Sequence, residues 1–338
     1  MAINTSRKTR YLISLTLALC VITGSQVARA EVEWVSFTMD NDAFAGNDNG
    51  YTNGIYVSWF DTPEGKPAEI GFLARAMKWS LPDSGSSGIG FSLGTIGQTM
   101  ITPDDIEEDP PILPPDDLPY GGLLFYADTF VQIQQSHADS ISVTIGVVGE
   151  PSLAEDSQKA VHDIISSDDP CCWDEQLDDE VVFQVSRGRV WKTWVSDSGN
   201  SDFLLSADLA LGTISSQAGA GFMYRYGKEL KNSFATALLV NSRTANPITA
   251  QSGWYLFAGA RASYLANQIF LDTSKSYDDD FDEIDYDDSR IGVTAGFAYA
   301  WKEWSFTFAM NDLNVNEDDD SAEEYSEYGT FTLAWKLD

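Results

Sequence analysis

Two separated segments of the chain hold the residue types that metal-assisted hydrolysis needs. The first, "TMDNDAFAGNDNGYTNG" at 38–54, contains four Asn, three Asp and three Gly. The second, "SLAEDSQKAVHDIISSDDPCCWDEQLDDE" at 152–180, contains His162, one of two histidines beyond the first thirty residues. An imidazole has a pKa suited to abstracting a proton near neutral pH. Asp and Asn oxygens are ligands that calcium prefers, and a hard cation polarises an ester carbonyl.

The second segment has the pattern of a short helix. Ser152 with Glu155 reads as a capping box that opens a helix of three turns. Gln158 and His162 are four residues apart, so they share one face of that helix. The one Gly-x-Ser-x-Gly match, Gly90-Phe91-Ser92-Leu93-Gly94, lies within a predicted strand and not at the strand-to-helix turn of a nucleophile elbow, so water is a better candidate nucleophile than serine.

Each of these residues also has a structural interpretation, which the residues alone leave open. A single His on a helix is more often structural than catalytic. The Asn, Asp and Gly residues of the first segment are also common turn formers, because they bond to their own backbone. The fold must therefore bring the two segments together before a shared site is credible.

Alternation of large apolar with small or polar residues predicts the elements that would position them. Ile291, Val293, Phe297, Tyr299 and Trp301 share one face of a strand, with small residues between them. This pattern is typical of an all-β transmembrane antiparallel barrel with lipid outside. A soluble sandwich would bury the large face instead. About twelve such strands are predicted, at roughly 33–41, 53–61, 87–101, 121–134, 139–149, 180–196, 202–213, 217–227, 253–270, 289–301, 303–314 and 326–337.

An even number of strands places both ends of the barrel chain in the periplasm. Connections after odd-numbered strands then face outward, which brings His162 toward Asn41, Asp42 and Thr52. His137, in the connection after the fourth strand, falls on the opposite side. The connection at 62–86 is a long periplasmic one with a possible short helix.

The first thirty residues read as a secretory signal peptide. They have a basic start, an apolar core and the sequence Ala28-Arg29-Ala30, so we expect cleavage before Glu31 and a barrel over 31–338. The formal charge of the whole chain is −32, from 20 basic and 52 acidic residues. Such acidity argues against nucleic-acid partners. Cys171 and Cys172 are adjacent, so only a vicinal disulfide is conceivable between them.

Four stretches resemble the outer-membrane lipid A 3-O-deacylases, a family of twelve-stranded barrels. They are "DNDAFAGNDNGYTNG", "GQTMITPDD", "LPYGGLLFY" and "QKAVHDIISSDDPCCWDEQ". The resemblance implies a monomeric outer-membrane enzyme that hydrolyses an acyloxyacyl ester of lipid A, in lipopolysaccharide, with Ca²⁺ at its outer mouth. It implies His162 as general base, Gln158 as a positioning residue, Asn41 and Asp42 at the metal and oxyanion end, and Thr52 nearby.

The chain departs from the family pattern at two places. Asp168 stands where a family member has Glu, and it is expected to contact the metal. Between Lys78 and Lys159 the chain has no Lys, although a family member uses one there. A non-enzymatic barrel of the porin or adhesin kind, or an outer-membrane phospholipase, remains the alternative to a lipid A hydrolase.

Overall fold

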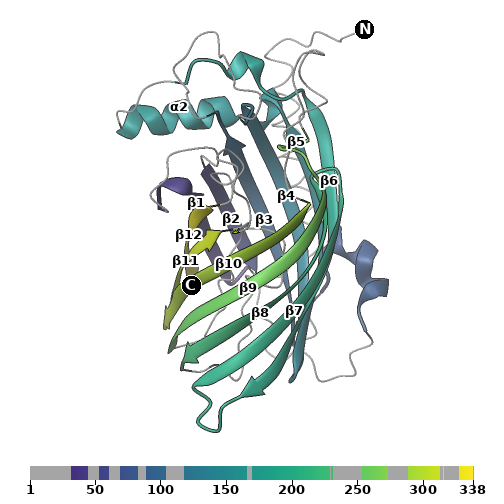
Figure 1. Ribbon diagram of the computed structural model, residues 1–338, viewed down its shortest axis with the longest axis vertical. Helices are drawn as coiled ribbons and strands as arrows, with labels where there is room; N and C mark the ends of the chain where they lie inside the picture. Colours follow the sequence, from purple (N-terminus) through teal and green to yellow (C-terminus); the bar gives the residue numbers. More distant parts are fainter. Residues whose placement is uncertain are drawn as a thin grey trace.

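The computed structural model describes a closed antiparallel β-barrel whose sheet order runs β1-β12-β11-β10-β9-β8-β7-β6-β5-β4-β3-β2 (Figure 1). The prediction of a twelve-stranded, all-β barrel is confirmed. The described residues are 32–44, 53–60, 69–82, 89–103, 118–165, 170–228, 230, 253–272, 288–312, 315 and 327–337. The strands are β1 Trp34–Asn41, β2 Asn53–Phe60, β3 Ile89–Ile101, β4 Gly121–Ile133, β5 His137–Val148, β6 Glu180–Val195, β7 Ser201–Gly212, β8 Ser215–Gly227, β9 Gly253–Gln268, β10 Ser289–Trp301, β11 Trp304–Asp312 and β12 Glu327–Lys336.

In the part of the chain that the structure describes, five short helices accompany the strands. They are η2 Asp42–Phe44, η3 Ala74–Ser80, η4 Glu150–Ser152, α2 Ala154–Ile165 and η5 Trp173–Glu175. Among the described residues, no helix has both the length and the apolar character needed to cross a membrane.

Side-chain alternation separates the lipid-facing wall from the lumen. Leu205, Leu209 and Leu211 of β7 are exposed, and so are the large residues of β10 that the sequence pattern placed on one face. Residues of the opposite parity are mostly buried, and many of them are small or polar. The hydroxyls of Thr38 and Thr332, for example, lie 2.9 Å apart where β1 closes on β12. Because lipid satisfies apolar side chains only, this alternation fixes which face of every strand is outside.

The lumen is filled by side chains and ion pairs. Arg225 donates to both carboxylate oxygens of Asp202, at 2.9 Å and 2.6 Å, and both residues are fully buried. Arg261 pairs with Asp208 in the same way, with Nη2 2.6 Å from Oδ2. A buried charge is tolerated when it is paired and hydrogen-bonded, as here.

The lumen is closed by apolar side chains at the end that carries α2. Ile101, Leu118, Leu123, Leu177 and Phe270 belong to one buried cluster there. We call this end of the barrel the α2 end. It carries the connections that follow odd-numbered strands, including the long one from β5 to β6 that contains α2.

The connection after β2 carries the predicted short helix, which is η3. It lies against the outside of the barrel, because the amides of Leu73 and Ala74 donate to Oδ2 of the outward-facing Asp128, at 2.8 Å and 3.3 Å. Ala74 packs on Phe130 and Ile141 of the same outer wall. Figure 1 shows η3 at the side of the barrel, away from α2.

Candidate active site

At the α2 end of β1, β2 and β3, the candidate site residues face away from the lumen. In β1 the inward residues are Ser36, Thr38 and Asp40, so Asn41 has the outward parity. In β2 the exposed Val57 marks the outward series, and Asn53 belongs to it. In β3 the partner of Asn53 is Met100, which therefore faces outward as well. Asn41, which the sequence placed at the outer mouth of the barrel, thus lies on the outer wall close to that mouth.

The helix α2 is held against this outer wall by η4. Gln98 of β3 has the outward parity, and its Nε2 donates to the carbonyl of Ser152 at 2.7 Å. A Cβ on the outward Gly122 would overlap with Ser152 Oγ and Ala154 Cβ, so this glycine lets η4 and α2 approach the wall closely. Figure 1 shows α2 lying across this end of the barrel.

The predicted start of the helix needs a correction. Leu153 has a left-handed backbone with φ of 60°, so η4 ends at Ser152 and α2 begins at Ala154. Ser152 Oγ accepts from the amide of Ala154 at 3.4 Å, two residues on. Glu155 forms an ion pair with Lys159, four residues on, at 2.8 Å. The sharp turn at Leu153 aims the helix along the wall.

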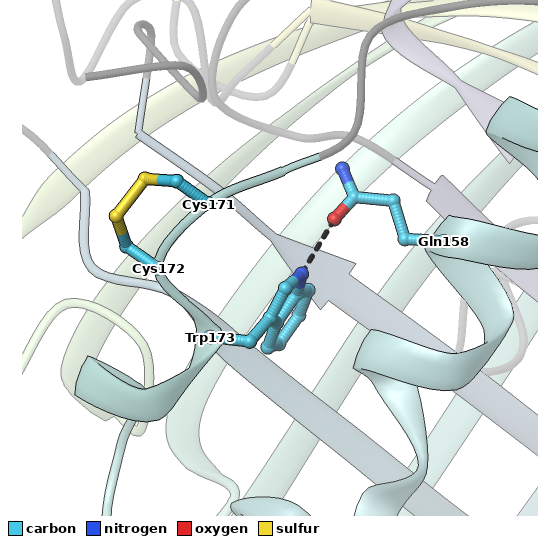
Figure 2. The surroundings of a disulfide bond; sticks show 4 residues. All are labelled: Gln158, Cys171, Cys172 and Trp173. Carbon is cyan, nitrogen blue, oxygen red and sulfur yellow. Dashed lines mark hydrogen bonds between the residues drawn. A yellow bond between two sulfur atoms is a disulfide. The ribbon is translucent and has the colours of Figure 1, made fainter. Parts of the chain in front are cut away.

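Gln158 is fixed by a buried tryptophan (Figure 2). Trp173 Nε1 donates to Gln158 Oε1 at 2.7 Å, and both side chains are almost completely buried. The Trp173 ring packs on Tyr120 with centroids 5.1 Å apart, in a cluster that includes Met100 and Ala154. His162 lies one turn further along α2 and is partly exposed.

Figure 2 also shows that the residues before Trp173, Cys171 and Cys172, form a disulfide. This vicinal bridge lies directly before η5. It belongs to the short segment that delivers the tryptophan to Gln158.

On the other flank, η2 also folds onto the outer wall. Phe44 lies over the outward Gly329 of β12, where a Cβ would overlap with it. The Phe44 ring meets the edge of Phe308 with centroids 6.2 Å apart. Asp42, at the start of η2, is buried. We call Asn41, Asp42, Asn53, Gln158 and His162 the outer-wall site.

Strand spacing sets the width of this site. Asn41 and Asn53 are the residues directly beyond the last β1–β2 pair, Asp40 and Gly54. Asn53 pairs with Met100, which packs under α2. Adjacent strands lie about 4.8 Å apart, so Asn41 is about 10 Å from the wall position that α2 covers.

Two predicted site residues, Thr52 and Asp168, lie outside the described residues. Within those residues there is no group of three His, Cys, Asp or Glu side chains that could hold a metal ion. The oxygens that suit calcium here include amides, from Asn41 and Asn53, beside the Asp42 carboxylate. The other histidine, His137, begins β5 instead of lying in the turn before it, and is at the end opposite α2.

Sequence reasoning missed four residues that build the site: Asn53, Gln98, Tyr120 and Gly122. The sequence did hold a clue to Asn53, because the alternation of the predicted strand places it on the same outward face as Ile55 and Val57. Gln98 is likewise a polar residue in an outward series. Tyr120 and Gly122 belong to the stretch LPYGGLLFY that resembles the family, but the sequence placed them only at the entry to the fourth strand, since their role depends on where η4 and η5 pack.

Comparison with known proteins decides the family. The matching family model is described as outer membrane protein LpxR, and the match covers residues 12–337. This chain belongs to the LpxR family. LpxR from Salmonella typhimurium has a similar structure, with a TM-score of 0.70 and 14% identity over 90% of this chain and 100% of that one.

Other barrels are less similar to this LpxR family member. The KdgM porin gives a TM-score of 0.38 at 5% identity, over 90% of this chain and 99% of its own. Outer membrane phospholipase A from Escherichia coli gives a TM-score of 0.30 at 8% identity, over 91% of this chain and 96% of its own. No curated protein sequence matches the chain. Membership of the LpxR family makes the protein an outer-membrane enzyme that modifies lipid A.

Proposed function

We propose that this protein hydrolyses an ester-linked acyloxyacyl chain of lipid A in the outer leaflet, and that the reaction depends on calcium. The observation that carries the proposal is the position of the outer-wall site. Asn41 and Asn53 face outward, and α2 is docked on the same side of the wall. A lipid in the outer leaflet can therefore reach the site laterally, without entering the closed lumen.

The chemistry assigns His162 as the general base. Its imidazole takes a proton from water, and the water oxygen forms a bond to the ester carbonyl carbon. The ester C–O bond then breaks, and the leaving alkoxide takes the proton from the imidazolium. The products are a free acyloxyacyl carboxylic acid and a hydroxyl on lipid A, so atoms and charges balance.

Gln158 is the positioning residue beside this base. Its Oε1 is occupied by Trp173, which leaves the amide NH₂ group to orient water or the ester. Because the two residues are four apart on α2, they share a face.

The oxygen-rich flank of the site suits a hard cation. Asn41 and Asp42 would hold calcium, with Thr52 and Asp168 as further proposed contacts. Bound there, calcium would polarise the ester carbonyl and offset the negative charge that develops on its oxygen. The Asp42 carboxylate supplies oxygens of the kind that calcium prefers.

The test compares lipid A from cells that express the wild type, His162→Ala or His137→Ala, with analysis by mass spectrometry. We expect loss of one acyloxyacyl group with the wild type and with His137→Ala, and intact lipid A with His162→Ala or a calcium chelator. His137 is the matched control, because it lies at the opposite end of the barrel. Unchanged lipid A from the wild type in calcium would contradict the proposal. Release of fatty acid from phosphatidylethanolamine, or conductance in planar bilayers, would point to the phospholipase or porin alternative.

A further inference from the structure

The amide oxygen of Asn53 is a buried acceptor without a hydrogen bond. Asn53 is the first residue of β2 and is 8% exposed. Its Oδ1 has no hydrogen-bond partner among the described residues. Buried side-chain oxygens in folded proteins are almost always paired with protein, water or an ion, so this atom requires an explanation.

The position of Asn53 places that oxygen inside the outer-wall site. Its partner across β3, Met100, is covered by Ala154 and Trp173 of the α2 region. On its other side is Asn41, the residue directly beyond the Asp40–Gly54 pair. Cross-strand neighbours on one face have Cβ atoms about 4.5–5.5 Å apart. Asn53 therefore lies between the residue proposed to contact calcium and the wall under α2.

A packing role does not account for an asparagine here. The next outward residues of β2 are Ile55, Val57 and Trp59, all apolar. A turn-forming role does not account for it either, because Asn53 is within a strand and pairs with Met100. A carbonyl oxygen needs a donor or a cation, and the neighbouring Asp42 adds negative charge that favours a cation.

We propose that Asn53 Oδ1 is an additional ligand of the cation in the outer-wall site, an inference that rests on the proposed calcium dependence. Calcium takes six to eight oxygen ligands and accepts amide carbonyls among them. A neutral amide adds a ligand without adding a charge to a site that already holds Asp42. On binding the cation, the buried oxygen gains the partner that it lacks.

The experiment measures calcium affinity directly, by calorimetry and terbium luminescence on the purified full chain, together with thermal unfolding with and without calcium. The variants are Asn53→Ala and Asn53→Asp, and the matched control is Asn200→Ala in the exposed turn between β6 and β7. We expect Asn53→Ala to weaken calcium binding about 10-fold, a typical effect of losing one interaction worth about 1.4 kcal/mol. Asn53→Asp should retain or tighten binding, and Asn200→Ala should match the wild type.

The metal-free proteins separate a ligand role from a structural one. Without calcium, Asn53→Ala should unfold at the same temperature as the wild type or higher, because an unpaired oxygen has been removed. With calcium, its gain in unfolding temperature should be smaller than that of the wild type. Equal calcium affinity in the wild type and Asn53→Ala would overturn the inference. The inference would also be overturned if Asn53→Ala unfolds at a lower temperature than the wild type without calcium, but its unfolding temperature rises as much as that of the wild type when calcium is added.

The outcomes distinguish this inference from the proposed function. A wild type that binds calcium and releases an acyl chain, with an unchanged Asn53→Ala, refutes the role of Asn53 alone. A wild type that binds calcium without releasing any acyl chain refutes the proposed reaction, while the affinity of Asn53→Ala still decides its role. If Asn53→Ala does not fold, Asn53→Asp tests the inference in its place. A carboxylate at a ligand position should bind calcium at least as well as the amide, so weaker calcium binding by Asn53→Asp would contradict a ligand role.

Discussion

Trp173 Nε1 donates a hydrogen bond of 2.7 Å to Oε1 of Gln158, and this bond joins the segment after α2 to the helix itself. The two residues are fifteen positions apart and almost completely buried. The bond therefore fixes one face of α2, and His162 lies one turn along that face.

Replacing Trp173 by Phe should destabilise the protein and slow the proposed hydrolysis. The substitution keeps most of the ring but leaves Gln158 Oε1 buried without its donor, at a cost of about 1–3 kcal/mol. We expect a lower unfolding temperature and a rate reduced by about 10-fold, the effect of about 1.4 kcal/mol. Unfolding monitored by circular dichroism and lipid A analysis test both parts.

The double variant Trp173→Phe with Gln158→Leu separates packing from chemistry. Removing both polar partners should restore much of the lost stability, because no unpaired oxygen remains. Activity should stay low, because the amide that positions water or the ester is gone. Recovery of full activity in the double variant would show that Gln158 serves only to hold α2.

A side chain at Gly122 should lift α2 from the wall. A Cβ there overlaps with Ser152 Oγ and Ala154 Cβ, and the latter cannot rotate away. We expect Gly122→Val to fold as a barrel, since the strands are unaffected, but to lose about 100-fold in rate, as misplacement of catalytic groups by about 1 Å does. Ala220→Val, at an exposed position of β8, is the matched control and should retain wild-type activity.

Much of the barrel could be predicted from the sequence, because lipid outside and a packed lumen inside impose alternation on every strand. β2, predicted at 53–61, is Asn53–Phe60, and β10, predicted at 289–301, is Ser289–Trp301. Strand counting also predicted that Asn41 and His162 belong to the same end. It could not show that η2 and η4 fold onto the outer wall, since that depends on the close approaches at Gly122 and Gly329 and on the turn at Leu153.

The contact between Phe44 and Phe308 should control the calcium requirement. Phe44 holds η2, and so Asp42, against the outer wall of β12. Phe44→Ala removes an edge-to-face aromatic contact worth about 0.5–1.5 kcal/mol, so the calcium concentration for half-maximal activity should rise about two- to tenfold. The rate at saturating calcium should change little. A reduced rate at saturating calcium with an unchanged calcium requirement would contradict a role through Asp42.

The vicinal disulfide should stabilise the docking of Trp173. Cys171 and Cys172 lie directly before Trp173, and their bridge restricts the backbone that orients the indole toward Gln158. Replacing both by Ser should lower the free energy of local opening by about 0.5–3 kcal/mol, the usual range for one structural change. Deuterium exchange should then be faster in peptides from α2 and from 170–177, while strands β7 to β10 exchange as in the wild type. Treatment of the wild type with a thiol reductant should reproduce the effect, and treatment of the Ser variant should add nothing. Equal exchange in α2 with and without the bridge would show that the packing of Trp173 on Tyr120 is sufficient by itself.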